Sequence, residues 1–221
     1  MESTISNSKN NHITYKAEVG RKIIHLLSLL IPIIYAFVND RVIGLSVMIP
    51  IMIFTLVINF VTNIEGKHRA FLMNLYGDML REHEITPKWY MLNGASFVLV
   101  AATISLAIFP VDIFLVAFSV LVISDTSAAL FGRRFGKKKL LGNKTYIGTL
   151  AFLLSGCLVA LFVVYVREIE PIGILFFFIG VLVGTLGELF SDYSKIDDNF
   201  VIPILTGLVS WLLFWAFSIP I

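Results

Sequence analysis

Long apolar runs alternate with short polar segments along most of the chain. A helix needs about 20 apolar residues to cross roughly 30 Å of hydrocarbon, and seven runs approach that length. The first run is short, and Pro32 is expected to kink it. We therefore predict an all-α integral membrane protein with about seven transmembrane helices. The apolar runs lie near residues 23–38, 42–61, 92–109, 113–131, 147–166, 172–190 and 200–218.

The polar segment between the second and third runs has a helical pattern of its own. Apolar residues recur at helical spacing between Phe71 and Leu80, with charged and amide side chains interleaved. This pattern is typical of an amphipathic helix that lies on a membrane surface. We expect such an interfacial helix near residues 68–84.

The distribution of basic residues predicts an orientation in the membrane. The chain is 57% hydrophobic and 14% charged with a net charge of +2, whereas soluble domains average about 25% charged residues. Of the 17 Lys and Arg residues, only Arg41 and Arg167 lie in connections on one side. The positive-inside rule then places the N-terminus in the cytoplasm and the C-terminus outside. The predicted inner segments are 1–22, 62–91, 132–146 and 191–199.

One domain is expected from the length and composition of the chain. A polar cytoplasmic N-terminus over residues 1–22 would precede a single polytopic catalytic domain over residues 23–221. No small-residue cleavage site follows the first apolar run, so we expect a retained helix and not a secretory signal. The expected location is the cytoplasmic membrane or an equivalent endomembrane, with the active site on the cytoplasmic side.

Polar residues within the predicted spans gather toward one side of the membrane. His25, Asn59, Asn93, Asp125 and Glu188 all fall toward the predicted cytoplasmic ends of their helices. A channel or a transmembrane proton relay would spread polar groups across the bilayer. The observed pattern instead favours a site that opens at the inner leaflet.

The segment from Ser124 to Ala151 combines an intramembrane acid with a dense basic loop. Asp125, Ala128, Gly132 and Gly136 share one face of a continuous helix. Asp125 could hold a divalent cation or take a proton from an alcohol, while the loop binds nucleotide phosphates. The alternative is a small-residue packing seam, with Asp125 hydrogen-bonded between helices and the loop acting as a topology anchor. The basic residues are Arg133, Arg134, Lys137, Lys138, Lys139 and Lys144.

The sixth predicted span repeats this design with Gly180, Gly184 and Glu188 spaced by four. If its small-residue face and that of the fourth span turn toward one cavity, Asp125 and Glu188 could share a Mg²⁺ ion. The alternative is two unrelated buried acids, each satisfied by a neighbouring hydroxyl or basic side chain.

Two further groups lie at the predicted inner boundary. Arg21 and Lys22 can be explained as basic residues that mark the inner boundary of a helix. His25, which shares a helical face with Arg21, is not explained in this way. Asp197, Asp198 and Asn199 precede the last span, where Asp and Asn residues also cap helices.

Four groups of residues follow one another in order from Arg21 to about Gly207. Together they resemble the motifs of the CTP-dependent lipid kinase family, which includes dolichol kinase, phytol kinase and the CTP-using diacylglycerol kinase. The groups are Arg21-Lys22-x-x-His25; Leu80-Arg81-x-His83-Glu84; Asp125-x-x-Ala128-x-x-x-Gly132-x-x-x-Gly136 with Lys144-Thr145 and Gly148-x-x-Ala151; and Glu188 with Asp198-Asn199-x-x-x-Pro203.

The resemblance implies transfer of the γ-phosphoryl group of CTP to a membrane lipid alcohol, such as a polyprenol, a phytol-like alcohol or diacylglycerol. It implies that Asp125 and Glu188 bind Mg²⁺ or another divalent cation, and that Asp125, His25 and Arg21 are catalytic. No nucleic-acid partner is expected. The expected CTP-binding residues are Ala128, Gly132, Arg133, Gly136, Lys137, Lys138, Lys139, Lys144, Thr145 and Gly148. Further motif positions are Lys22, Arg81, Glu84, Asp198 and Asn199.

Two departures from the family pattern bear on this expectation. Asn143 stands where a Lys often precedes Lys-Thr, and Ile147 stands where an acid is common. Either Asp125 and Glu188 are sufficient to bind the cation without a further acid at position 147, or the activity differs from that of the family. Two other functions stay open from the sequence: a CTP:phosphatidate cytidylyltransferase-like enzyme, which releases pyrophosphate, and a small lipid transporter or flippase, which would need polar residues in the outer halves of its helices.

Overall fold

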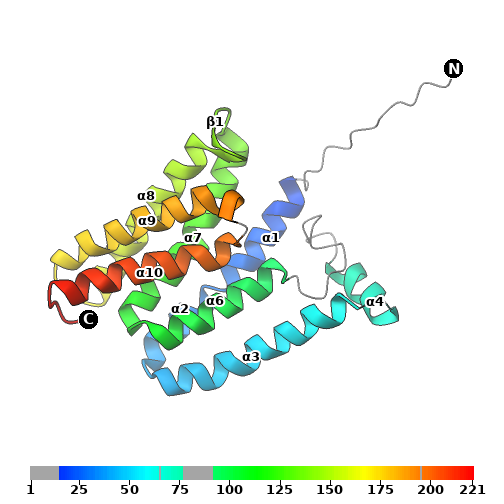
Figure 1. The fold of residues 1–221 in the computed structure, drawn as a ribbon, viewed down its shortest axis with the longest axis horizontal. Helices are drawn as coiled ribbons and strands as arrows, with labels where there is room; N and C mark the ends of the chain where they lie inside the picture. The colour runs from blue at the N-terminus through cyan, green and yellow to red at the C-terminus, as the bar shows by residue number, and fades with distance from the viewer. Residues whose placement is uncertain (1–14, 65, 77–91, 195) are drawn as a thin grey trace.

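A computed structural model describes residues 15–64, 66–76, 92–194 and 196–221 as a bundle of packed helices (Figure 1). Six helical segments are long and apolar enough to cross a membrane, so the prediction of a mainly α-helical membrane protein is confirmed. The helices are α1 (Tyr15–Leu27), α2 (Leu30–Val38), α3 (Arg41–Thr62), α4 (Lys67–Tyr76), α6 (Gly94–Ile108), α7 (Val111–Phe135), α8 (Tyr146–Val166), α9 (Ile172–Ser194) and α10 (Asp198–Ala216).

The first apolar span, Val19–Val38, is divided between α1 and α2. Proline has no N–H group, so Pro32 cannot donate to the carbonyl of Ser28 four residues earlier, and its ring crowds that carbonyl. The Ser28 carbonyl accepts from the N–H of Ile31 instead, at 3.0 Å. The break therefore falls just before Pro32, which confirms the predicted kink.

The expected third span corresponds to the shorter apolar helix α6, which has 15 residues. At 1.5 Å per residue it measures about 22 Å, less than the hydrocarbon thickness. Both of its ends have local causes. The side chain of Asn93 caps the first turn by accepting from the N–H of Ser96 at 2.9 Å. Phe109 is extended because the following Pro110 disfavours the helical conformation.

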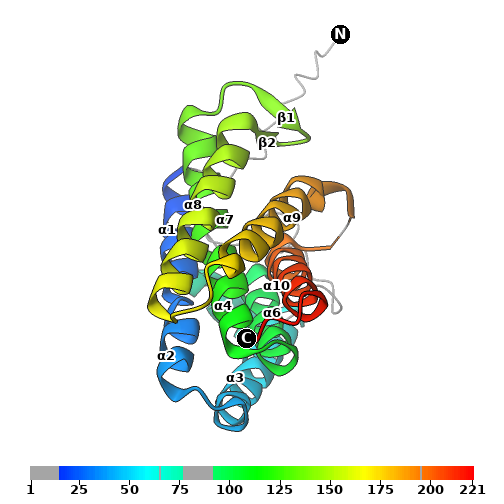
Figure 2. The same cartoon turned by 90° about the vertical axis from the view of Figure 1, so that its left-hand side faces the viewer.

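Helix α7 is the centre of the bundle. In its most apolar stretch 72% of the residues are buried, whereas the figure for α3 is 11%. It packs against α8, α10, α1 and α2, while α3 lies at the periphery and packs mainly on α6 (Figures 1 and 2). The exposed apolar side chains of α3, such as Phe54 and Val42, fit a surface that faces lipid.

A two-stranded hairpin joins α7 to α8 and was not predicted from the sequence. Strands β1 (Lys139–Leu141) and β2 (Lys144–Thr145) pair antiparallel, and Gly142 makes the turn with φ at 53°. The hairpin projects at one end of the bundle, which we call the hairpin end (Figure 2). Because β2 runs back toward α8, it returns Lys144 to the helices.

The opposite end of the bundle is closed by contacts among three connections. The Arg167 side chain donates to Asp112 at 2.5 Å and to Asn39 at 3.5 Å. Arg41 donates to the carbonyl of Phe109 at 2.8 Å. These contacts place the connections that precede α3, α7 and α9 side by side, so consecutive spans alternate in direction.

The amphipathic segment is described only in part. Helix α4 (Lys67–Tyr76) covers the first half of the helix expected near 68–84. Residues 77–91, which include the motif positions Arg81 and Glu84, lie outside the described residues.

The glycines of α9 form a seam with α10. A Cβ on Gly180 would lie 2.7 Å from the carbonyl oxygen of Thr206, and a Cβ on Gly184 would collide with the Thr206 side chain. Direct contact between α7 and α9 is sparse. The prediction that the small-residue faces of these two helices share one cavity is therefore wrong, because the glycines of α9 face α10.

This seam predicts a strong effect of Gly180→Val on stability. The added side chain must force α9 and α10 apart, and overpacking of this kind costs about 1–3 kcal/mol. Thermal unfolding of the purified protein in detergent should show a lower midpoint. Leu182→Val, at a site 48% exposed on the same helix, should change the midpoint little. Equal effects of the two substitutions would contradict the seam.

Candidate functional site

A buried ion pair joins α1 to α7 near the hairpin end. The ammonium of Lys22 donates to the Asp125 carboxylate, and the two side chains are only 4% and 9% exposed. An isolated charge in an apolar interior is very costly, so each of these groups depends on the other. The Lys22 side chain points into the bundle, so marking the helix boundary does not by itself account for this residue.

His25 joins the same pair. Its Nε2 atom lies 3.7 Å from the Asp125 carboxylate, and its side chain is 10% exposed. Lys22 and His25 are three residues apart on α1, so both reach the same side of the helix. Asp198, at the start of α10, also acts electrostatically on His25.

A second set of ion pairs joins the hairpin to α9 and α10. The ammonium of Lys144 donates to Glu188 at 2.6 Å and lies 3.5 Å from Asp198. Glu188 is 4% exposed and Lys144 is 19% exposed. Helix capping was the alternative for Asp197, Asp198 and Asn199, and Asp197 does cap α10 by accepting from the N–H of Asn199. Asp198 is thereby left for Lys144.

The two sets form one electrostatic unit. Burial would lower the pKa of the Lys144 ammonium, but the carboxylates of Asp198 and Glu188, with a contribution from Asp125, raise it above its ordinary value. Lys144 is therefore a permanent cation between acids from three helices. We call this unit the charge cluster; it consists of Lys22, His25, Asp125, Lys144, Glu188 and Asp198.

The charge cluster retains unused carboxylate oxygens. Oε2 of Glu188 and Oδ1 of Asp198 are buried and have no hydrogen-bond partner within the described part of the chain. Carboxylate oxygens are the ligands that Mg²⁺ prefers, so these atoms fit a cation. The described residues contain no group of three or more His, Cys, Asp or Glu arranged to hold a metal by themselves. Mg²⁺ in proteins commonly keeps waters and substrate phosphates as its other ligands.

The small residues of the α7 strip form a close contact with the start of α8. A Cβ on Gly132 would lie 3.1 Å from the hydroxyl of Thr145, and one on Gly148 would lie 3.0 Å from the carbonyl of Ala128. The Thr145 hydroxyl also caps α8 by accepting from the N–H of Gly148 at 3.1 Å. Gly132, Gly136 and Gly148 thus hold α7 against α8, and their contact with a nucleotide stays a prediction.

The remaining predicted site residues divide between surface and interior. The basic side chains of the loop are exposed, and Lys138 lies over the ring of Tyr146 at 5.4 Å from its centroid. Arg21 is half-buried on α1. Asn199 is buried and donates to Asp197 at 2.6 Å. The exposed basic residues are Arg133, Arg134, Lys137, Lys138 and Lys139.

Comparison with curated proteins finds similarity to the Uncharacterized protein RP860 of Rickettsia prowazekii (strain Madrid E). The two chains are 27% identical over 187 residues, which is 85% of this chain and 90% of the relative. No family model matches the chain, and no solved structure matches it.

The Lys22–Asp125 pair predicts that Lys22→Met is strongly destabilising. Removing one partner leaves a buried, uncompensated carboxylate, which typically costs about 3–5 kcal/mol. Thermal or denaturant unfolding in detergent micelles should show this loss, whereas the exposed-site variant Lys138→Met should show little change. Adding Asp125→Asn to Lys22→Met removes the stranded charge and should recover most of the stability. A double variant as unstable as Lys22→Met would contradict the pairing.

The raised pKa of Lys144 predicts how its contribution to stability varies with pH. The folded-state pKa exceeds the ordinary value of about 10.4. The stabilisation is then complete at every pH below about 10.4 and is lost only as the pH rises through the higher folded-state pKa. The difference in unfolding midpoint between the native protein and Lys144→Met should stay constant from neutral pH to mildly alkaline pH. A difference that shrinks near neutrality would show that Lys144 is not held by the acids.

Proposed function

We propose that the protein is a CTP-dependent kinase that phosphorylates the hydroxyl of a membrane lipid alcohol. The observation that carries this proposal is the convergence of distant segments on the charge cluster. The members of this cluster come from separate parts of the chain: Lys22 and His25, Asp125, Lys144, Glu188 and Asp198. Each of them belongs to a segment that resembles a motif of the CTP-dependent lipid kinases. Packing alone gives no reason for these segments to meet at one buried polar site.

The proposed orientation places the charge cluster within reach of a soluble nucleotide. We propose seven membrane-crossing helices, with α6 as the short one, a cytoplasmic N-terminus and an outer C-terminus. The basic residues of the hairpin would then face the cytoplasm, in line with the positive-inside rule. The charge cluster lies at the same end as the hairpin, because Lys144 of β2 is one of its members.

The chemistry follows from the groups present. The oxygen of the lipid hydroxyl bonds to the γ-phosphorus of CTP as the bond from that phosphorus to the β-phosphate oxygen breaks and CDP leaves. The proton of the hydroxyl passes to Asp125, which His25 flanks. Lys144, Thr145 and the basic hairpin hold the triphosphate and balance its charge. Phosphoryl transfer depends mainly on such positioning and charge neutralisation.

A divalent cation fits this arrangement. Glu188 and Asp198 are the proposed ligands, because each has a buried carboxylate oxygen without a hydrogen-bond partner in the described part of the chain. When bound, Mg²⁺ would neutralise charge on the phosphates. Lys144 lies against both Glu188 and Asp198, so a cation there would share these carboxylates with the ammonium.

The proposal predicts the products of a defined assay. Purified protein with labelled CTP, Mg²⁺ and a panel of lipid alcohols should form CDP and a lipid monophosphate. Release of pyrophosphate with a cytidylyl-lipid would instead identify a cytidylyltransferase, and absence of any CTP-dependent product would contradict an enzyme of either kind.

Asp125→Asn serves as the site variant in this assay. It keeps the size and polarity of the side chain but removes the charge that proton transfer needs, so turnover should fall at least about a hundredfold. Asp40→Asn is the matched control, because it makes the same change outside the charge cluster, at an exposed position where asparagine can still cap α3. Near-normal activity of Asp125→Asn would remove Asp125 from the mechanism.

A further inference from the structure

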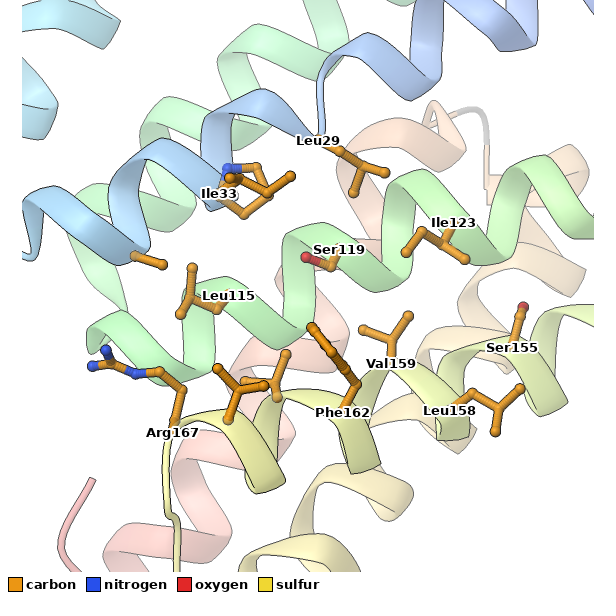
Figure 3. A pocket seen from close by; sticks show the side chains of 14 residues that line it. Leu29, Ile33, Leu115, Ser119, Ile123, Ser155, Leu158, Val159, Phe162 and Arg167 are labelled. Atoms are coloured by element: carbon orange, nitrogen blue, oxygen red, sulfur yellow. The ribbon is translucent and has the colours of Figure 1, made fainter.

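An apolar cavity of about 410 Å³ lies between α2, α7 and α8 (Figure 3). Its volume falls in the range of about 300–1,000 Å³ that is typical of small-ligand sites. Leu115 and Val159 form part of its buried wall, since they are 5% and 7% exposed. Ile33 and Phe162 stand at its edge and are 50% and 66% exposed. The cavity is therefore a groove that opens sideways, toward the hydrocarbon of the membrane.

One end of this groove reaches the depth of the charge cluster along the bundle axis. Ile123 is two residues before Asp125, which is about 3 Å along α7, and Leu29 follows α1, the helix that carries His25. Both side chains line the groove. Figure 3 shows Leu29 and Ile123 toward one end and Arg167 at the other.

The far end of the groove is closed by charge. Arg167 lines it and is paired with Asp112 at 2.5 Å. Between Ile123 and Leu115 the groove follows α7 for about 12 Å, a substantial part of the roughly 30 Å hydrocarbon core. A ligand that fits must be apolar along this length.

We propose that this groove binds the apolar chain of the lipid alcohol and so places its hydroxyl beside Asp125 and His25. The inference rests on the proposed function for the identity of the hydroxyl-bearing ligand. Its own support is that the apolar groove reaches the depth of the charge cluster and is open on the side of the exposed Ile33 and Phe162. A nucleotide would lose its hydration in a groove lined by Leu, Ile, Val and Phe side chains, which is energetically costly. The groove would thus bind the apolar chain of the lipid alcohol, and the charge cluster would act on its hydroxyl.

Photolabelling tests the groove without requiring turnover. Two long-chain alcohols, one with a diazirine near the hydroxyl and one with a diazirine at the far end of the chain, are incorporated with the purified protein into phosphatidylcholine vesicles. The far-end probe should label the α7 and α8 residues around Leu115 and Phe162, and the near-hydroxyl probe those around Leu29 and Ile123. Excess unlabelled alcohol should compete. Labelling spread evenly over the lipid-facing side of α3, or competed equally well by phospholipid, would overturn the proposal.

Ser119→Phe blocks the groove at its middle, where the serine side chain lines it (Figure 3). Each methylene removed from an apolar site lowers affinity about fourfold, so far-end labelling by the long-chain probe should fall roughly tenfold or more. Ser46→Phe makes the same change at an exposed position of α3 and should leave labelling unchanged. Unchanged labelling in Ser119→Phe would overturn the groove.

The labelling and the CTP assay separate the two proposals. Groove labelling that persists in Asp125→Asn, together with CTP turnover in the native protein, supports both. Labelling without any CTP-dependent product keeps the groove and removes the kinase. Turnover without specific labelling of the groove keeps the kinase and overturns the groove.

Discussion

The arrangement of this protein depends on pairing buried carboxylates with lysines in an apolar surrounding. Asp125, Glu188 and Asp198 are each at most 9% exposed, and an unpaired carboxylate at such depth is very unfavourable. Lys22 and Lys144 supply the compensating charges from α1 and from the hairpin. Each pairing ties a peripheral segment to the central helices, so the position of α1 and of the hairpin follows from the need to neutralise these acids.

Close helix packing makes these pairings possible. In hydrocarbon, small residues let helix backbones approach closely, because apolar surface alone gives no preference for protein over lipid. The Gly180 and Gly184 seam brings α9 onto α10, and the Gly132 and Gly148 contact brings α7 onto α8. Glu188 then reaches Lys144 beside Asp198, while Asp125 stays near the same ammonium. The glycine strips therefore act first by setting a short distance between neighbouring helices.

Polarity changes along the axis of the bundle in a way that matches an amphiphilic substrate. The charge cluster and the basic hairpin occupy one end, and an apolar groove extends along α7 from about the depth of the cluster toward the other end. A lipid alcohol has the same sequence of properties, with a reactive hydroxyl followed by an apolar chain. This correspondence supports the proposed kinase more strongly than either feature does alone.

Local patterns in the sequence determined the helices and most of the candidate residues. Apolar length and periodicity predicted the spans, Pro32 predicted the break in the first one, and the rarity of charge within spans singled out Asp125, His25 and Glu188. These features depend on a residue and its near neighbours, so they can be recognised without a fold. Spacing did offer a signal for Lys22, which lies three residues before His25, but a basic residue at a helix boundary has an equally simple explanation.

Only the tertiary structure decided which charges meet. The partner of an intramembrane acid depends on the rotation of each helix and on which helices adjoin, and neither is encoded in hydropathy. For that reason the sequence paired Asp125 with Glu188 across one cavity, whereas the fold gives Asp125 to Lys22 and Glu188 to Lys144. The hairpin that returns Lys144 to the bundle and the groove between α2, α7 and α8 arise in the same way, from contacts between segments far apart in the chain.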